Sequence, residues 1–202
     1  MHSSDIAAHE DRVTAFKKDL YVRDLRDIVR KHITTGDPVV IRPDTYYELR
    51  RDVASKFNIH PNSVVLVGSC RLGFSLKPER RYQPIQASFD VDVTIISAAL
   101  FDFYWDRVFD VWQNNIVWRT SPDAKKFKTN LLRGWIDPRV LPNLPSLAMS
   151  QDWAEFFDKL SRRQVCGRRW INARLYRTWD RLEAYQEIMV LDCLNDLKRN
   201  QE

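Results

Sequence analysis

Two runs of hydrophobic residues stand out in the pattern of apolar and polar positions along the chain. The first is Val64–Val67, which ends at Gly68 and Ser69. In the second, residues 89–96, acidic and apolar residues alternate before the run becomes mostly apolar. β-Branched residues favour strands, and alternation is typical of a strand that buries one face. The pattern therefore predicts two strands that enter a hydrophobic core.

Apolar residues spaced by three, four or seven positions predict helices over much of the remaining chain. Short polar residues precede most of these stretches, where their side chains can cap a helix, and Gly or Pro ends others. The N-terminal pattern has one break, near Tyr21 and Val22. The predicted helices cover residues 6–34, 46–57, 98–114, 151–163 and 179–198.

Four other stretches carry weaker patterns. Residues 168–177 alternate in polarity, which predicts a strand, with a helix continuous with the next one as the alternative interpretation. Residues 116–118 are apolar and predict a short strand. Residues 134–147 hold three prolines and predict an irregular connector. Residues 74–88 separate the two apolar runs and predict a flap or hairpin.

The chain has 202 residues, which is enough for one sizeable core. No repeat, low-complexity tract or linker divides it. We therefore expect a single α+β domain over residues 1–202. Within it, residues 1–57 are expected to form a helical N-terminal extension, residues 64–96 the strands that carry the main motif, and residues 178–199 a C-terminal helix.

Candidate chemistry gathers in the two predicted strands. Asp90 and Asp92 are two positions apart, so both side chains project from the same face of a strand. Two adjacent carboxylates raise each other's pKa unless a cation lies between them, and Mg²⁺ prefers such oxygen ligands. Gly68 and Ser69 provide a bend without a Cβ, backbone N–H groups and a hydroxyl, which together suit a phosphate. The pattern therefore favours a site for a metal ion and a phosphate.

This order of motifs resembles the nucleotidyltransferase superfamily related to DNA polymerase β. The resemblance covers residues 64–96, with Gly68-Ser69 after the first strand and Asp90-Val91-Asp92 in the second. It implies a nucleotidyltransferase-like fold, in which a small mixed or antiparallel sheet is flanked by helices. Small bacterial nucleotidyltransferases of toxin–antitoxin or antiviral phage-defence systems are the nearest type at this length.

The resemblance also implies roles for individual residues. Gly68 and Ser69 would hold the triphosphate of an NTP, and Asp90 and Asp92 would be catalytic and bind Mg²⁺ or Mn²⁺. A nucleotidyl group would pass to an acceptor that the sequence does not identify: a protein, an RNA end or a nucleotide. The basic residues expected to bind the nucleotide are Arg71, Lys77 and Arg174.

The chain departs from the family pattern in two ways. The spacer between Ser69 and Asp90 is longer, and no third carboxylate is evident on a later strand, where Asn172 and Arg174 stand. An alternative hypothesis is therefore a catalytically incomplete protein of the same fold that binds a nucleotide, nucleic acid or a protein partner. In a third hypothesis the two aspartates only form structural ion pairs with Arg174 or Arg71.

Composition narrows these expectations further. A net charge of +5 and a pI near 9.2 favour anionic partners such as nucleotides. No hydrophobic run approaches the roughly 20 residues of a membrane span, and no secretory signal is evident. Three cysteines, Cys70, Cys166 and Cys193, lack metal-ligand spacing and are expected to be reduced. We therefore expect a cytoplasmic protein without a membrane partner.

Overall fold

A computed structural model describes residues 3–85, 89–163 and 168–200 of the chain. The last three residues of the predicted flap, 86–88, and Cys166 lie outside the described residues. The other two cysteines, Cys70 and Cys193, are buried and form no disulfide within the described residues. Within the three described ranges, no helix is both long and apolar enough to cross a membrane.

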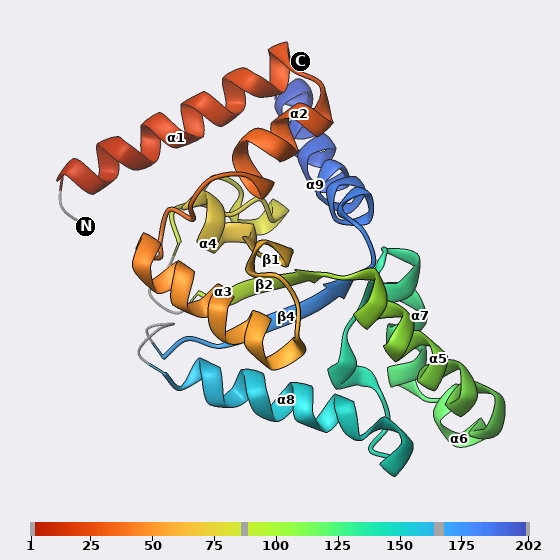
Figure 1. The fold of residues 1–202 in the computed structure, drawn as a ribbon. Coiled ribbons are helices and arrows are strands. Elements are labelled where there is room, and N and C mark those ends of the chain that lie inside the picture. Colours follow the sequence, from red (N-terminus) through yellow and green to blue (C-terminus); the bar gives the residue numbers. More distant parts are fainter. Residues whose placement is uncertain (1–2, 86–88, 164–167, 201–202) are drawn as a thin grey trace.

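Four short strands are interspersed among the helices of the described chain (Figure 1). η1 is a π-helix, and the other η elements are 3-10 helices. The elements follow in the order α1 (Ser3–Val22), α2 (Leu25–Val29), η1 (Arg30–Thr34), α3 (Pro43–Phe57), η2 (Pro61–Ser63), β1 (Val64–Val67), α4 (Gly68–Leu72), η3 (Pro78–Arg80), β2 (Val91–Ile96), α5 (Ala98–Asn114), α6 (Ile116–Arg119), α7 (Pro122–Leu132), β3 (Trp135–Ile136), η4 (Pro138–Val140), η5 (Pro145–Leu147), α8 (Ala148–Ser161), β4 (Ile171–Tyr176) and α9 (Trp179–Arg199).

The strands form one mixed sheet in the order β1-β2-β4-β3. β1 pairs with β2 in the antiparallel direction and places Val67 opposite Asp92. β2 and β4 are parallel, with Asp92 opposite Asn172 and Thr94 opposite Arg174. β3 adds an antiparallel edge strand next to β4. The described chain is therefore α+β, with a small mixed sheet flanked by helices, as predicted.

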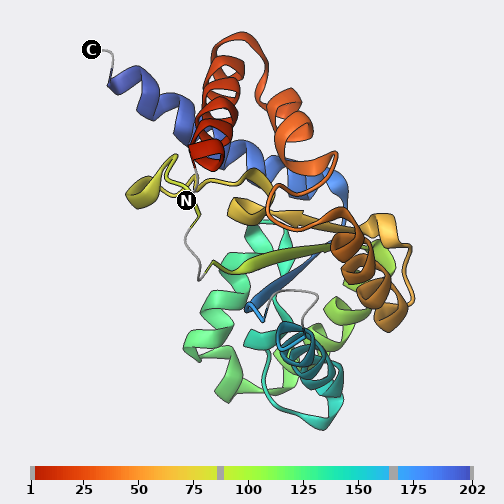
Figure 2. The ribbon, with the colours of Figure 1, turned by 90° about the vertical axis from the view of Figure 1, so that its left-hand side faces the viewer.

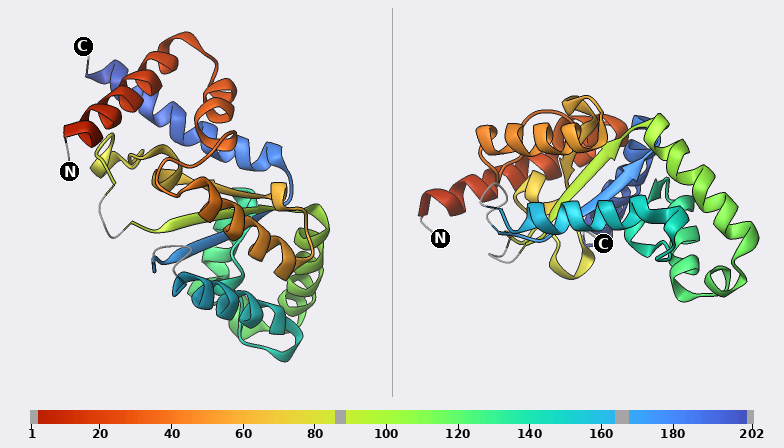
Figure 3. Two further views of the ribbon diagram at one scale, coloured as in Figure 1. Left: turned by 60° about the vertical axis from the view of Figure 1, so that its left-hand side comes forward. Right: turned by 60° about the horizontal axis from the view of Figure 1, so that its bottom comes forward.

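Helices cover both faces of this sheet (Figures 2 and 3). On one face, Leu66, Val93 and Ala173 pack in a core with α3 and α5–α8. On the other face, Val67 and Ile96 pack in a second core with α1, α2, η1 and α9. Because side chains alternate along a strand, each strand contributes to both cores. The sheet is thus the middle of three layers.

Most of the predicted strands and helices are confirmed. The strands predicted over residues 64–67, 89–96 and 168–177 are present as β1, β2 and β4. The helices predicted over residues 46–57, 98–114 and 179–198 are present as α3, α5 and α9, although α3 begins earlier, at Pro43. The side chains of Ser97 and Thr178 cap α5 and α9, because they accept hydrogen bonds from the backbone N–H groups of Leu100 and Arg181. α8 is also present, although it begins earlier than predicted, at Ala148.

Two predictions about the helices need correction. Residues 116–118 form α6 and not a strand, because Asn115 caps a helical turn by accepting a hydrogen bond from the N–H of Trp118. The predicted helix over residues 6–34 is divided into α1, α2 and η1. Asp24 has an extended backbone and accepts a hydrogen bond from the N–H of Asp27, so a new helix starts there.

The region between α6 and α8 is more ordered than its prolines predict. α7 was not predicted; it begins where Ser121 accepts a hydrogen bond from the N–H of Ala124. The predicted connector over residues 134–147 contains β3, because Trp135 and Ile136 pair with the end of β4. Partners distant in the sequence thus create this strand.

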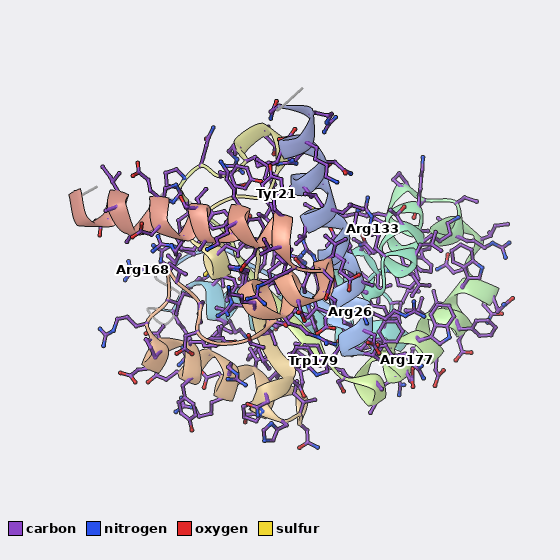
Figure 4. The ribbon with its side chains drawn as sticks, turned by 90° about the horizontal axis from the view of Figure 1, so that it is seen from above. Tyr21, Arg26, Arg133, Arg168, Arg177 and Trp179 are labelled. Carbon is purple, nitrogen blue, oxygen red and sulfur yellow. The ribbon has the colours of Figure 1, made fainter. Side chains whose placement is uncertain are left out.

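The N-terminal helices are attached to the C-terminal helix. α2 packs on α9, and Figure 4 shows Arg26 at this junction, seen from above. The Nε atom of Arg26 lies 2.6 Å from Glu187 Oε1, and the guanidinium of Arg30 donates to Glu183 at 3.0 Å. Ion pairs between the first and last parts of the chain therefore hold α9 beside the sheet.

Candidate functional site

A cavity of about 280 Å³ lies where the end of β1, the start of β2 and the middle of β4 meet α9 and the segment after α4. Six of the seven residues selected from the sequence line it, so the fold brings together groups from four separate parts of the chain. They are Gly68, Ser69, Lys77, Asp90, Asp92 and Arg174.

The bend at Gly68 lies beside the carboxyl group of Asp92. The antiparallel pairing of β1 and β2 places Val67 opposite Asp92, so the residue that follows β1 lies next to the Asp92 side chain. Gly68 has a φ of +69°, and a Cβ at this position would lie 2.7 Å from Asp92 Oδ2. A side chain at Gly68 would therefore be strained and would also displace the carboxylate.

Asp90 and Asp92 face the cavity from the same side of the sheet, as the spacing predicts. Burial raises the pKa of Asp92, and the charge of Asp90 raises it further, while Arg174 and Lys77 act in the opposite direction. The Nη2 atom of Arg174 lies 3.7 Å from Asp92 Oδ1, which is an ion pair but is too long for a hydrogen bond. Arg174 therefore compensates the charge of Asp92 only in part.

The side chain of Asn172 forms a hydrogen bond with the carboxylate of Asp90. Its Oδ1 atom accepts hydrogen bonds from Trp170 Nε1 at 3.1 Å and from Arg139 Nη1 at 3.2 Å. Two donors at Oδ1 leave the amide nitrogen facing Asp90, and Nδ2 donates to Asp90 Oδ2 at 3.1 Å. Asn172 is also the residue paired with Asp92 across β2 and β4. A neutral amide therefore stands in the strand position next to Asp92.

Two buried carboxylates elsewhere in the described chain, those of Asp137 and Glu183, are engaged in ion pairs. Asp137 is 7% exposed and forms an ion pair with Arg139 at 3.0 Å, and Glu183 pairs with Arg30. Over the described part of the chain, no group of three or more His, Cys, Asp or Glu side chains could hold a metal ion. Two carboxylates remain, and this number suits Mg²⁺, which is often bound through one or two carboxylates together with substrate phosphates.

Arg71 lies apart from the cavity. One turn after Gly68 in α4, its side chain points towards η1, where Nε donates to the carbonyl oxygen of His32 at 3.2 Å. Arg71 is 6% exposed, and burial lowers the pKa of its guanidinium. Its observed contact joins α4 to η1, and it does not line the cavity with the other predicted residues.

Sequence reasoning missed several residues that line or support the cavity. Arg139 lies in the proline-containing connector, where no periodicity indicated a role. Tyr185, Gln186 and Met189 lie in α9, which was interpreted only as a packing helix. One signal was available: Gln186 is a polar residue on a helix face that also carries Leu182, Val190 and Cys193, and it is buried with them.

Comparison of this chain with protein-family models, with curated proteins and with solved structures gives no match. The functional interpretation therefore depends on the side chains of the cavity. Those side chains combine two carboxylates on one strand, a glycine bend in contact with one of them, and three basic groups, Lys77, Arg80 and Arg174. This combination suits an anion that carries a metal ion.

Proposed function

We propose that the cavity binds a nucleoside triphosphate with a divalent cation, and that the chain is a nucleotidyltransferase. The observation that carries this proposal is that the Gly68 bend and the Asp92 carboxyl group lie side by side in one cavity. A phosphate-binding bend and a carboxylate that binds a metal ion must lie side by side to grip both parts of a metal–triphosphate. A phosphate-binding bend and a metal-binding carboxylate that lay far apart could not bind the same metal–triphosphate.

The arrangement of elements supports the same proposal. A helix, α3, precedes β1; a short helix, α4, starts at Gly68; and Asp90 and Asp92 lie at the start of the neighbouring strand β2. A later strand, β4, lies on the other side of β2. This is the layout expected of the nucleotidyltransferase superfamily related to DNA polymerase β, which the sequence motifs resemble.

Charges in the cavity favour a triphosphate. Lys77, Arg80 and Arg174 face two carboxylates, so the cavity carries more positive than negative groups before a ligand enters. The Ser69 hydroxyl and the cationic side chains can donate hydrogen bonds to phosphate oxygens. Lys77 and Arg80 belong to the segment after α4, which therefore acts as the basic wall of the cavity.

Asp90 and Asp92 would hold Mg²⁺ or Mn²⁺, which when bound would neutralise phosphate charge and lower the pKa of an attacking hydroxyl. Asn172 keeps the Asp90 carboxylate in place through its amide nitrogen. Ser69 and Lys77 would orient the β- and γ-phosphates. The acceptor oxygen then forms a bond to the α-phosphorus, the bond from that phosphorus to the bridging oxygen breaks, and pyrophosphate leaves with the electron pair.

A specific observation favours a second candidate function. Asn172 takes the strand position beside Asp92, and Arg174 lies 3.7 Å from the Asp92 carboxylate. Among the described residues that line the cavity, Asp90 and Asp92 are therefore the acidic ones, and one of them is partly compensated by Arg174. The second candidate is therefore a protein that binds the metal–nucleotide without transferring it, and that presents the bound nucleotide to nucleic acid or to a protein partner.

One experiment separates the two functions. The wild-type chain and an Asp90→Ala/Asp92→Ala variant are incubated with labelled NTPs and Mg²⁺ or Mn²⁺, and pyrophosphate release and thermal stability are measured. For a nucleotidyltransferase we expect release by the wild type and a loss of about 100-fold or more in the variant. Nucleotide-dependent stabilisation without release by the wild type would support the binding protein.

A matched control uses another aspartate. Asp102 lies on α5, where it pairs with Arg177 at 2.8 Å, and it is not among the residues that line the cavity. The Asp102→Ala variant should release pyrophosphate as the wild type does. If neither release nor stabilisation is seen with any of the NTPs, both candidate functions are wrong and the two aspartates serve the fold.

A further inference from the structure

We propose that the cavity contains a nucleobase subsite on α9, in which Gln186 reads the hydrogen-bonding edge of the base. This inference rests on the proposed function, and it names the part of the substrate that the phosphate and metal groups do not recognise. The subsite would make the protein select one nucleobase among the NTPs.

The first observation that supports a nucleobase subsite is the position of the Gln186 side chain. It lines the cavity, yet it is only 5% exposed. Within the described chain, its side-chain amide makes no hydrogen bond to another residue. Its amide atoms are not sealed in the protein interior, unlike the unpartnered hydroxyl groups of Thr94 and Tyr176, so they are open to the cavity. An amide that lines a cavity without bonding to another residue is available to a ligand with complementary polar atoms.

The surfaces around Gln186 suit a flat apolar ring. Tyr185 and Met189, on the same helix, line the cavity, and Pro84 and Ile85 line it from the segment after α4. Aromatic and aliphatic side chains on the walls of a cavity favour a planar heterocycle through apolar contact.

The tyrosine at this position is held in place by its neighbours. The ring of Tyr185 packs edge-on against Trp135, with 4.5 Å between the ring centroids and 75° between the ring planes. Trp135 in turn lies beneath the guanidinium of Arg174, 5.3 Å from the ring centroid. A chain of contacts therefore connects the phosphate side of the cavity to the α9 side.

The chemistry of a glutamine amide identifies the class of ligand. The amide presents a donor and an acceptor side by side, and nucleobases carry matching pairs of donor and acceptor atoms along their edges. A phosphate would use only the donor, and an aliphatic group would use neither. A nucleobase therefore satisfies both polar atoms of Gln186 and also fills the apolar walls.

The test measures the affinity of four NTPs and of inorganic tripolyphosphate, each with Mg²⁺, by calorimetry. The wild type, Gln186→Met and Gln186→Glu are compared, with Gln113→Met on the exposed face of α5 as the matched control. Gln186→Met keeps the size of the side chain but removes both polar atoms. Gln186→Glu replaces the donor by an acceptor.

We expect the wild type to bind one NTP at least about tenfold more tightly than the others, as one or two selective hydrogen bonds allow. Gln186→Met should bring the four NTPs within about threefold of one another, and Gln186→Glu should change which NTP binds best. Tripolyphosphate affinity should stay unchanged in Gln186→Met, which shows that this variant is folded, whereas the added negative charge of Gln186→Glu should weaken the binding of every polyphosphate. Gln113→Met should behave as the wild type.

Two contrary results have different meanings. If the wild type binds tripolyphosphate and all four NTPs with equal affinity, or if Gln186→Met keeps the wild-type preference, the nucleobase subsite is wrong and the proposed function stands. If the wild type binds neither tripolyphosphate nor any NTP, the proposed function fails and the subsite fails with it.

Discussion

At the scale of single residues, the carboxyl group of Asp92 lies where ionisation is unfavourable. It packs against the Gly68 bend, it is near a second carboxylate, Asp90, and its cationic neighbour Arg174 lies 3.7 Å away. Burial raises the pKa of Asp92. An acid whose pKa is raised on folding destabilises the folded chain once it is ionised. The ionised Asp92 carboxylate therefore lowers the stability of the folded chain, which is common in sites that bind a ligand.

This cost leads to a prediction about Asp92→Asn. The variant should unfold at a higher temperature than the wild type at pH 7 without divalent cations, because it removes a charge that folding disfavours. Arg174 is 30% exposed and can remain hydrated, so the lost ion pair should matter less. We expect a gain of a few degrees, since about 1 kcal/mol shifts the midpoint by roughly 2–4 °C in a chain of this size.

The pH dependence of the same variant checks the cause. Because the pKa of Asp92 is raised, its cost appears as the pH rises above the ordinary value of 3.8 and is absent below it. The gain of Asp92→Asn should therefore vanish at acidic pH. Asp102→Asn should not stabilise the chain, because the hydrogen bond from Arg177 lowers the pKa of Asp102. A gain that persists at low pH would contradict this explanation.

At the scale of elements, the segment between α4 and β2 is fastened to α9. Backbone hydrogen bonds join Ser75 to Gln83 and Tyr82, so the described part of this segment folds back on itself, as the predicted flap or hairpin would. Arg81 then connects it to α9: its Nη1 atom donates to the carbonyl oxygen of Asp192 at 2.9 Å, and its guanidinium pairs with the carboxylate of Asp192. Arg81 thus ties two walls of the cavity together.

We therefore predict that Arg81→Met destabilises the fold by about 1–3 kcal/mol, because hydrogen bonds to charged groups contribute about this much. The acidic partners are partly exposed, so the substitution leaves no buried carboxylate. Urea unfolding measures the change. Arg80→Met is the control, since Arg80 is exposed and should change stability by less than about 0.5 kcal/mol. Equal effects of the two variants on stability would show that the bonds from Arg81 to Asp192 are unimportant.

At the scale of the whole molecule, the sheet is enclosed between two helical layers, and the N-terminal helix belongs to the layer that carries α9. Asp19 of α1 is 5% exposed and receives hydrogen bonds from Lys31 and His32 of η1 and from Arg23. Burial raises the pKa of Asp19, but these three hydrogen bonds together outweigh burial and hold the pKa well below its ordinary range. This network attaches α1 to the rest of the chain.

The network predicts how acid affects stability. Ionised Asp19 contributes stability that is fully present above the ordinary pKa of 3.8 and is lost as the pH falls towards the lower folded pKa. Asp19→Asn should therefore cost about 1.5–3 kcal/mol at pH 7, and the difference from the wild type should shrink in acid. Thermal unfolding at several pH values measures it. Asp44→Asn should show no such difference, because Asp44 is almost fully exposed.

The sequence predicted strands and helices correctly where residues close in the chain determine them. The apolar run of β1, the alternation of β2 and the caps Ser97 and Thr178 act within a few residues, so their effect is visible in the sequence. Prediction failed at residues 116–118, because three apolar residues fit a strand or a helical turn, and Asn115 decided between them. The expected role of Arg71 in nucleotide binding stays a prediction; in the structure its side chain donates to the carbonyl oxygen of His32.

By itself, the sequence determined the main strands and helices, the glycine bend and the acidic pair, because period, capping and backbone freedom depend on neighbouring residues. Only the tertiary structure decided that Asn172 holds Asp90 and that Arg139 holds Asn172. It also decided that Gln186, far along the chain, faces the same cavity. These positions depend on how distant elements pair and pack, and no short stretch of sequence contains that information.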